Sequence, residues 1–139
     1  MEHEPCLCTS LRQSALAVTQ IYDQALVPSG LKITMFRLLR RISHAGAPTI
    51  SELARIVDLD RSTLGRNLRV LERLGLVRLD GGTDERSKVV SLTRKGKAAF
   101  DKALPLWEEA QNAMKSMLGG EKDAVLRIQA KLSREDAAA

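Results

Sequence analysis

The sequence predicts a mainly α-helical α+β fold with one small β-hairpin. Apolar residues recur every three to four positions over most of the chain, which is the spacing of amphipathic helices. The spacing changes to two in residues 76–79 and 88–92, which lie on either side of a polar, glycine-rich loop. The length of 139 residues fits one domain, and 44% apolar and 28% charged residues are ordinary values for a globular protein.

The first predicted helix spans residues 7–26 and ends near Pro28 and Gly30, which break helices. Its apolar stripe is longer than a helix needs to cover one small domain, so a partner chain could cover the remainder. The stripe consists of Leu7, Leu11, Ala15, Val18, Ile21, Tyr22, Ala25 and Leu26.

A second helix is predicted from Ile33 to about Ser43, before a break at residues 45–48 (Ala-Gly-Ala-Pro). We expect the Thr34 hydroxyl to cap this helix and Ile33 to pack on Leu38 as a hydrophobic staple. The arginines of the helix face largely outward.

Two further helices, residues 50–57 and 61–74, follow with a short link between them. Residues 49–52 (Thr-Ile-Ser-Glu) form a capping-box pattern at the start of the first. Asp60 is a good N-cap for the second, and Gly75 suits the left-handed conformation that ends a helix. Two helices joined by a capped turn form a helix-turn-helix pattern.

The two short strands and the loop between them, residues 80–87, predict a hairpin after these helices. Thr93 can cap a long helical region that contains Pro105, which should kink it or remove one hydrogen bond. Glycines at 119–120 end this region. A last helix continues to about residue 135, and its apolar stripe is Val125, Ile128 and Leu132.

The net charge of +5 is unevenly distributed. Residues 32–97 carry fifteen Lys and Arg against seven Asp and Glu, whereas residues 1–31 carry one against three and residues 98–139 carry six against seven. A basic middle between slightly acidic ends favours a polyanionic partner for the middle and another role for the ends. The alternative is an ordinary solvated basic surface.

In a helix-turn-helix, the second helix lies in the major groove of DNA and its N-terminal residues reach base edges. The helix over residues 61–74 suits the groove because it has leucines on one face and Ser and Arg on the other. Arg66 is the best candidate to pair with guanine, and Arg73 ranks lower because it is near the helix end. The alternative is a surface helix with solvated arginines. The candidates for DNA contact on this helix are Arg61, Ser62, Thr63, Arg66 and Arg69.

The hairpin directly after these helices completes a winged helix-turn-helix pattern. Arg86 in its loop suits the negative potential of a narrow minor groove, and Asp84 could hold the Arg86 guanidinium through a bidentate ion pair. Lys88 and Arg78 could contact the phosphate backbone. The alternative for Asp84 and Arg86 is a surface pair that adds little stability. The whole layout favours sequence-specific binding to double-stranded DNA.

The chain resembles the MarR family of bacterial winged helix-turn-helix transcription regulators over about residues 7–135. Many winged-helix proteins share single segments, but the order of the matching segments, with Asp-x-Arg in the wing and helices at both ends, is a strong resemblance. These segments are GLKITMFRLL (30–39), TISELA (49–54), LDRSTL (59–64), LERLGLV (71–77), DERS (84–87) and LTRKG (92–96).

This resemblance implies one intertwined unit with three parts. An N-terminal dimerisation segment (1–31) and C-terminal dimerisation helices (97–139) flank a winged DNA-binding lobe (32–96). It further implies a homodimer that represses transcription and is released by a small aromatic or lipophilic effector. A cytoplasmic location is expected from the sequence itself, because Cys6 and Cys8 are too close for a disulfide framework and no signal peptide is recognisable.

The resemblance also implies how such a dimer reads DNA. Ser62, Thr63 and Arg66 would enter the major groove, and Arg86 would enter the minor groove. The operator would be a pseudo-palindrome with half-sites ~34 Å apart. Effectors of the family enter a crevice between the dimerisation helices and the winged lobe.

Four residues could contribute polar or aromatic contacts to that crevice: Arg12, Tyr22, His44 and Trp107. The alternatives are core or dimer packing for the two aromatic residues and an interaction with a helix C-terminus for the histidine.

Cys6 and Cys8 form a Cys-x-Cys pair that departs from a plain family sequence. Two nearby thiolates could bind a thiophilic metal ion such as Cu(I) or be oxidised against a partner chain's thiol. The positive end of the first helix could lower a thiol pKa. The alternative is a pair of small residues at a helix start. The spacing gives no structural zinc site, and we expect no cofactor.

The sequence disfavours other classes of protein. It has no phosphate loop, no Gly-x-Ser-x-Gly and no His-Glu-x-x-His, and two histidines and two cysteines make a catalytic set hard to assemble. We therefore expect no enzyme. A thiol enzyme and a winged-helix module that binds protein are the weaker alternatives. No apolar run reaches the ~18 residues of a membrane span, and a signal peptide is not recognisable.

Overall fold

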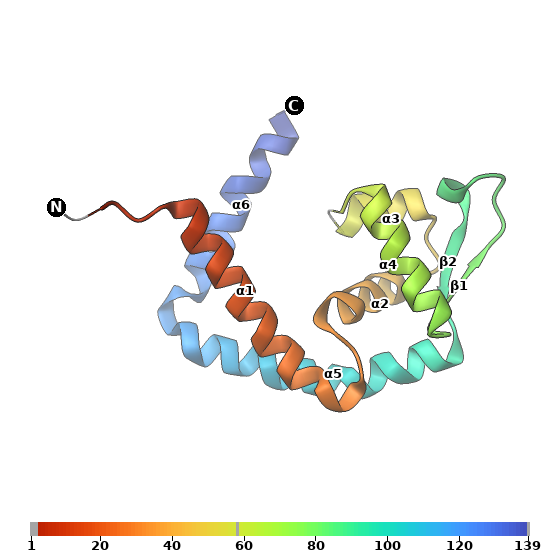
Figure 1. Cartoon of the computed structure of the whole chain (residues 1–139), viewed down its shortest axis with the longest axis horizontal. Helices are drawn as coiled ribbons and strands as arrows, with labels where there is room; N and C mark the ends of the chain where they lie inside the picture. Colours follow the sequence, from red (N-terminus) through yellow and green to blue (C-terminus); the bar gives the residue numbers. More distant parts are fainter. Residues whose placement is uncertain (1–2, 58, 139) are drawn as a thin grey trace.

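The computed structural model describes the backbone of residues 3–57 and 59–138, and side chains as far as Ser133 (Figure 1). The elements follow in the order α1 (Leu7–Leu26), η1 (Val27–Ser29), α2 (Ile33–Ala45), α3 (Ile50–Val57), α4 (Arg61–Arg73), β1 (Val77–Asp80), η2 (Glu85–Ser87), β2 (Val89–Leu92), α5 (Arg94–Leu118), η3 (Gly119–Glu121) and α6 (Lys122–Ala138). The predicted mainly helical class with one hairpin is confirmed.

A winged lobe forms one end of the molecule, and α5 runs from beneath it to the other end (Figure 1). The lobe consists of α2, α3, α4 and the hairpin, which enclose one apolar core. Each helix of the lobe turns its apolar face inward, since burying that face is the main stabilising term. The fully buried side chains of the lobe include Phe36, Leu39, Ile42, Leu53, Leu64, Leu68, Leu71 and Val90.

The helix starts around the helix-turn-helix are fixed by local caps, as predicted. The Thr49 hydroxyl accepts from the Glu52 backbone N–H at 3.1 Å, and the Glu52 carboxylate accepts from the Thr49 N–H at 3.3 Å. Asp60 accepts from the Thr63 N–H at 2.8 Å at the start of α4. Gly75 has φ +75 and ends the turn after α4.

The predicted cap of α2 is wrong. Lys32 is the N-cap residue and makes no side-chain cap hydrogen bond, because the helix begins two residues earlier than a Thr34 cap requires. The Ile33 N–H instead donates to the Asp23 carboxylate of α1 at 2.7 Å. The residue before the cap is therefore Leu31, which is buried, while Ile33 is half-buried and packs against the core cluster that contains Leu38.

The wing is an antiparallel hairpin in which Val77 pairs with Leu92 and Asp80 with Val89. A short extended segment before α3 adds to its edge. The Val90 N–H donates to the Pro48 carbonyl at 2.8 Å, and the Ile50 N–H donates to the Lys88 carbonyl at 3.0 Å. The sequence predicted the loop between the strands but not the short helix η2 within it.

The start of α5 is tied to the turn between α4 and β1. Thr93 caps α5 through the Gly96 N–H at 2.9 Å, as predicted, and its hydroxyl also donates to the Gly75 carbonyl at 2.5 Å. The backbone of Gly96 lies so close to Leu76 that a Cβ there would be 1.9 Å from the Leu76 carbonyl oxygen. α5 continues through Pro105 without a break in the helix.

The other end of the molecule consists of α1, the second half of α5, and α6. α1 packs across α5, and α6 rises from the far end of α5 (Figure 1). Large apolar side chains remain exposed on all three helices: Leu7, Leu11, Leu16, Met117, Val125, Leu126, Ile128 and Leu132. Over the described residues, no helix is both long and apolar enough to cross a membrane.

Candidate nucleic-acid interface

Helix α4 presents its polar face to solvent. Leu64, Leu68 and Leu71 anchor the helix in the core with exposures of 0% to 1%. Successive residues of a helix are rotated by about 100°, so residues three or four apart share a face. Anchoring the leucine face in the core therefore turns the Ser and Arg face outward. Arg61, Ser62, Arg66 and Arg69 are all exposed, and Thr63 is half-buried.

The first turn of α4 contains a chain of hydrogen bonds that orients Arg66. The Asp60 carboxylate accepts from the Thr63 backbone N–H and from its hydroxyl at 2.9 Å. Arg66 Nη2 in turn donates to the Thr63 Oγ1 at 3.3 Å. These two bonds from Thr63 hold the pKa of Asp60 below its ordinary value. Thr63 thus positions the Arg66 guanidinium at the surface.

The wing loop is held by a capping box that the sequence analysis missed. The Asp84 carboxylate accepts from the Ser87 N–H at 3.1 Å, and the Ser87 hydroxyl accepts from the Asp84 N–H at 3.4 Å. The Ser87 hydrogen bonds are the main cause of a lowered pKa for Asp84. The Asp-x-x-Ser spacing in residues 84–87 was the available signal.

The predicted bidentate pair between Asp84 and Arg86 is wrong in its geometry. Arg86 Nη2 lies 3.6 Å from Asp84 Oδ2, which is an ion pair beyond hydrogen-bond distance. The reason is that the Asp84 carboxylate already serves as the cap of η2. Arg86 is exposed at the wing and is only loosely held by this contact.

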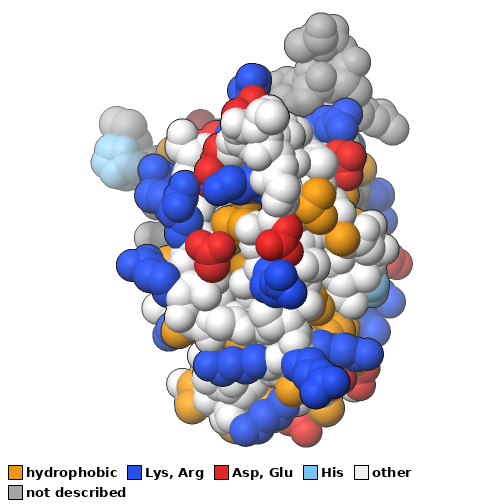
Figure 2. Space-filling view, turned by 90° about the vertical axis from the view of Figure 1, so that its right-hand side faces the viewer, with side chains coloured by type: hydrophobic (Ala, Val, Ile, Leu, Met, Phe, Trp, Pro, Cys, Tyr) orange, Lys and Arg blue, Asp and Glu red, His pale blue; other side chains and the backbone are white. Residues whose placement is uncertain are grey.

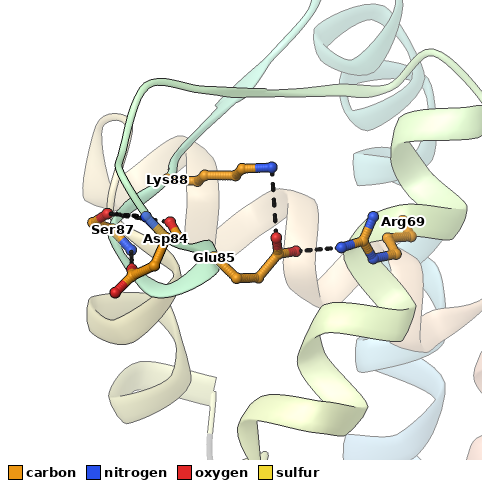
Figure 3. Close-up of polar contacts among 5 residues, drawn as sticks. All are labelled: Arg69, Asp84, Glu85, Ser87 and Lys88. Carbon is orange, nitrogen blue, oxygen red and sulfur yellow. Dashed lines mark hydrogen bonds and ion pairs between the residues drawn. The ribbon is translucent and has the colours of Figure 1, made fainter.

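Glu85 joins the wing to α4 (Figure 3). One of its carboxylate oxygens lies 2.7 Å from Arg69 Nη2, and the other lies 3.5 Å from Lys88 Nζ. The sequence analysis missed Glu85 because its partner on α4 is 16 residues away. Lys88 is therefore engaged within the wing, and Arg78 pairs with Asp80 on β1 at 3.5 Å.

An open hollow of ≈ 550 Å³ lies between α4 and the wing, and we call it the α4–wing hollow. Figure 2 faces this end of the molecule and shows Lys and Arg side chains over much of it, with a few acidic side chains among them. The structure thus brings together most of the residues predicted to contact DNA. The hollow is lined by Ile50, Arg61, Ser62, Gly65, Arg66, Arg69, Glu85 and Arg86.

The four residues predicted for an effector crevice lie in different surroundings. The Tyr22 hydroxyl donates to Gln111 Oε1 of α5 at 2.5 Å, and burial raises the Tyr22 pKa. The Trp107 ring stacks at 5.8 Å on Phe36, and the Arg40 guanidinium lies 4.5 Å from its centroid.

These contacts place Tyr22 of α1 against α5, and Trp107 of α5 against α2. Arg12 is exposed in the first half of α1, and His44 is exposed in the last turn of α2.

Cys6 and Cys8 are exposed free thiols at the start of α1. Cys6 is the N-cap residue. Its thiol pKa is lowered by the Thr9 hydroxyl and by the backbone N–H groups of Thr9 and Cys8, which stabilise a thiolate. Within the described part of the chain, no three His, Cys, Asp or Glu side chains converge to hold a metal ion.

Comparison with known proteins identifies related regulators. Residues 34–80 match a family described as a helix-turn-helix domain. The transcriptional regulator MosR of M. tuberculosis, crystallised in complex with DNA, is 42% identical, with a TM-score of 0.84 over 96% of this chain and 98% of that chain.

Two more distant proteins extend the comparison. A mutant MarR from E. coli, complexed with operator DNA, is 24% identical, with a TM-score of 0.76 over 90% of this chain and 91% of that chain. YwoH of Bacillus subtilis, described as an uncharacterized HTH-type transcriptional regulator, is 26% identical over 95 residues, which are 68% of this chain and 69% of YwoH.

Proposed function

Because this chain belongs to the MarR family of winged helix-turn-helix transcription regulators, and is not an enzyme, we propose that it acts as a homodimeric repressor in the cytoplasm. It binds a pseudo-palindromic operator in double-stranded DNA, and a small effector releases it. The observation that carries this proposal is that Arg66 of α4 and Arg86 of the wing line the same exposed basic hollow.

The two arginines suit different grooves of one duplex. Arg66 projects from the first half of an exposed helix whose opposite face is anchored in the core, as a major-groove helix requires. Arg86 projects from a hairpin beside that helix. An arginine at this position suits the adjacent minor groove, whose negative potential is strongest where the groove is narrow. Arg61, Ser62 and Thr63 add donors around these two. Arg69 and Lys88 lie beside them in ion pairs with Glu85, and Asp84 shapes the loop that carries Arg86.

A second copy of the chain is the partner that best fits the exposed apolar side chains at the other end. On α6, Val125, Leu126, Ile128 and Leu132 are 44% to 62% exposed. Contiguous apolar surface of this kind marks an interface. We therefore assign residues 1–31 and 97–139 to dimerisation and residues 32–96 to DNA binding.

The test is selection of bound sequences from random duplexes, followed by fluorescence anisotropy with the selected duplex. Arg66→Ala should weaken binding about ten- to a hundredfold and relax the preference at one base position, since a bidentate guanine contact contributes roughly 1–3 kcal/mol of discrimination. Arg86→Ala should weaken binding while the dimer stays intact. Lys102→Ala on the exposed side of α5 is the charge-matched control. If both arginine variants bind like the wild type, the assignment of these residues is wrong.

We place the effector crevice between the dimerisation helices and the lobe, near Tyr22 and Trp107, with Arg12 and His44 as further candidates. An aromatic or lipophilic molecule there would favour dimers whose α4 helices have the wrong spacing. Trp107 is the single tryptophan of the chain, so its fluorescence should change when a screened aromatic acid binds. A compound that releases DNA without any change in Trp107 fluorescence would contradict this location.

The exposed thiols support a second candidate trigger. Cys6, with its lowered pKa, and Cys8 are accessible to peroxide. Two thiols give up two electrons and two protons to hydrogen peroxide, which yields one disulfide and two waters. DNA binding measured before and after peroxide, and again after dithiothreitol, should change reversibly. A variant with Cys6→Ser and Cys8→Ser should not respond, and an equal response from that variant would rule out thiol sensing.

A further inference from the structure

We propose that Glu85 is a positioning residue that sets DNA specificity by holding the wing against α4 and withholding two cations from phosphate. The proposal rests on the DNA-binding function proposed above. Glu85 carries the wrong charge for contact with DNA, yet it lines the α4–wing hollow.

The contacts of Glu85 connect two separate elements. Its carboxylate lies 2.7 Å from Arg69 Nη2 on α4 and 3.5 Å from Lys88 Nζ at the start of β2 (Figure 3). Within residues 3–57 and 59–138, the Arg69–Glu85 contact is the ion pair that joins the wing to α4. The carboxylate thus adds a side-chain tie between the wing loop and the helix.

A capping box encloses Glu85 and Arg86, so a tie at Glu85 also places the backbone of Arg86. The capping box between Asp84 and Ser87 closes the loop around both residues. Gly82, at φ +77, lies against this box, and a Cβ there would be 2.8 Å from the Lys88 backbone nitrogen. Because the loop is packed this closely, Glu85 and its neighbour Arg86 move together.

The same carboxylate limits attraction to any DNA. The hollow is lined by four arginines, and Glu85 is the acidic residue among them. Arg69 and Lys88 would otherwise be available to phosphates, and phosphate contacts raise affinity without regard to sequence. Neutralising them within the protein leaves Arg66 and Arg86 to decide which duplex is bound.

Removal of the Glu85 charge has different consequences for DNA binding if Glu85 only repels phosphate and if it positions the wing. If Glu85 merely repelled phosphate, Glu85→Gln would strengthen binding to every duplex by one factor. If Glu85 positions the wing, the same change strengthens binding to unrelated DNA and fails to strengthen binding to the selected duplex equally. Exposed ion pairs contribute little to folding stability. Glu85→Gln should therefore change the ratio of the affinities for the selected and the unrelated duplex and leave the melting temperature unchanged.

The experiment compares wild type and Glu85→Gln on the selected duplex and on an unrelated duplex, at several salt concentrations. We expect the ratio of specific to non-specific affinity to fall about fivefold or more, in the range of coupling between contacting residues. We expect the salt dependence on the unrelated duplex to become steeper by about 0.9 for each cation released to a phosphate. Glu72→Gln removes the same charge from the exposed side of α4, outside the hollow, and should leave the ratio unchanged.

Three outcomes decide the proposal. A lower ratio for Glu85→Gln alone, at an unchanged melting temperature, supports it. An equal change on both duplexes, or the same change in Glu72→Gln, overturns it while the proposed function stands. If the wild type itself prefers no duplex, the proposed function fails, and the proposal about Glu85 fails with it.

Discussion

The winged lobe and the end formed by α1, α6 and the second half of α5 differ in how completely a single chain buries their apolar side chains. In the lobe, the core-facing leucines of α4 and the Phe36 ring of α2 are fully buried, and its helix starts are capped by neighbouring side chains. At the other end, apolar side chains of α1 and α6 remain exposed. The lobe therefore forms its core within one chain and exposes basic side chains to solvent. The other end exposes apolar surface that a second chain can bury.

The largest effect should come from a charge on the apolar surface of α6. Ile128→Glu should dissociate the proposed dimer and weaken operator binding by about 10²- to 10⁴-fold, because two linked lobes bind far more tightly than one. Leu74→Glu is the matched control, since Leu74 and Ile128 are both 44% exposed but Leu74 lies on the lobe. Sedimentation and anisotropy measure the two effects, and dissociation by both variants or by neither would remove the contrast between the regions.

The joint between the two regions should be the next most sensitive site. Gly96→Ala places a Cβ 1.9 Å from the Leu76 carbonyl oxygen, and backbone must move to relieve that overlap. We expect the free energy of unfolding to fall by about 3 kcal/mol or more, at the upper end of overpacking costs. Gly120→Ala, where a Cβ meets open space, is the control in urea denaturation. Equal stability of the two variants would show that α5 and the lobe are not closely joined.

Within the lobe, Gly65 should separate stability from binding. It lies inside α4 and lines the hollow, and a Cβ there meets nothing within 4 Å. Gly65→Ala should raise the free energy of unfolding by roughly 0.5–1 kcal/mol, because glycine is unfavourable in a helix interior. It should nevertheless weaken DNA binding, since the open space is where a duplex approaches. Tighter binding alongside higher stability would show that DNA does not come close to Gly65.

The smallest effect concerns acid sensitivity at the start of α4. Asp60 has a lowered pKa in the folded protein, so its charge adds stability above the ordinary carboxyl pKa of about 4, and this contribution is lost as the pH falls through the folded value. Asparagine can still cap a helix. Wild type should therefore have a higher urea midpoint than Asp60→Asn at neutral pH, and the two should converge in acid.

Thr63→Ala refines this acid test because it removes the hydroxyl donor and keeps the N–H donor. It should reduce the pH dependence without abolishing it. A constant difference between wild type and Asp60→Asn at every pH would show that the Asp60 charge does not stabilise α4.

Contacts between residues close together along the chain could be predicted from the sequence. Caps at Thr49, Asp60 and Thr93 were predictable because each acts on a backbone N–H three residues away. The hairpin was predictable because a change of apolar period and a glycine-rich loop are also local signals.

The features that escaped prediction depend on contacts between separate elements. Asp23 satisfies the start of α2 from another helix, and Glu85 reaches Arg69 from the wing. The Arg40 guanidinium of α2 lies over the Trp107 ring of α5. Such contacts are set by how helices pack together, so spacing along the chain does not reveal them. The basic residues that line the α4–wing hollow were candidates from the sequence, whereas the contacts of Arg69 and Lys88 with Glu85 were not expected.

The most direct test of the central claim is a contact map of the selected duplex by guanine methylation interference and hydroxyl-radical footprinting. We predict two half-sites centred about one helical turn apart, ~34 Å. Arg66→Ala should remove guanine interference in each major groove, and Arg86→Ala should remove the flanking minor-groove protection. A single half-site, or a pattern that neither substitution alters, would contradict the claim that paired α4 helices and wings read the DNA.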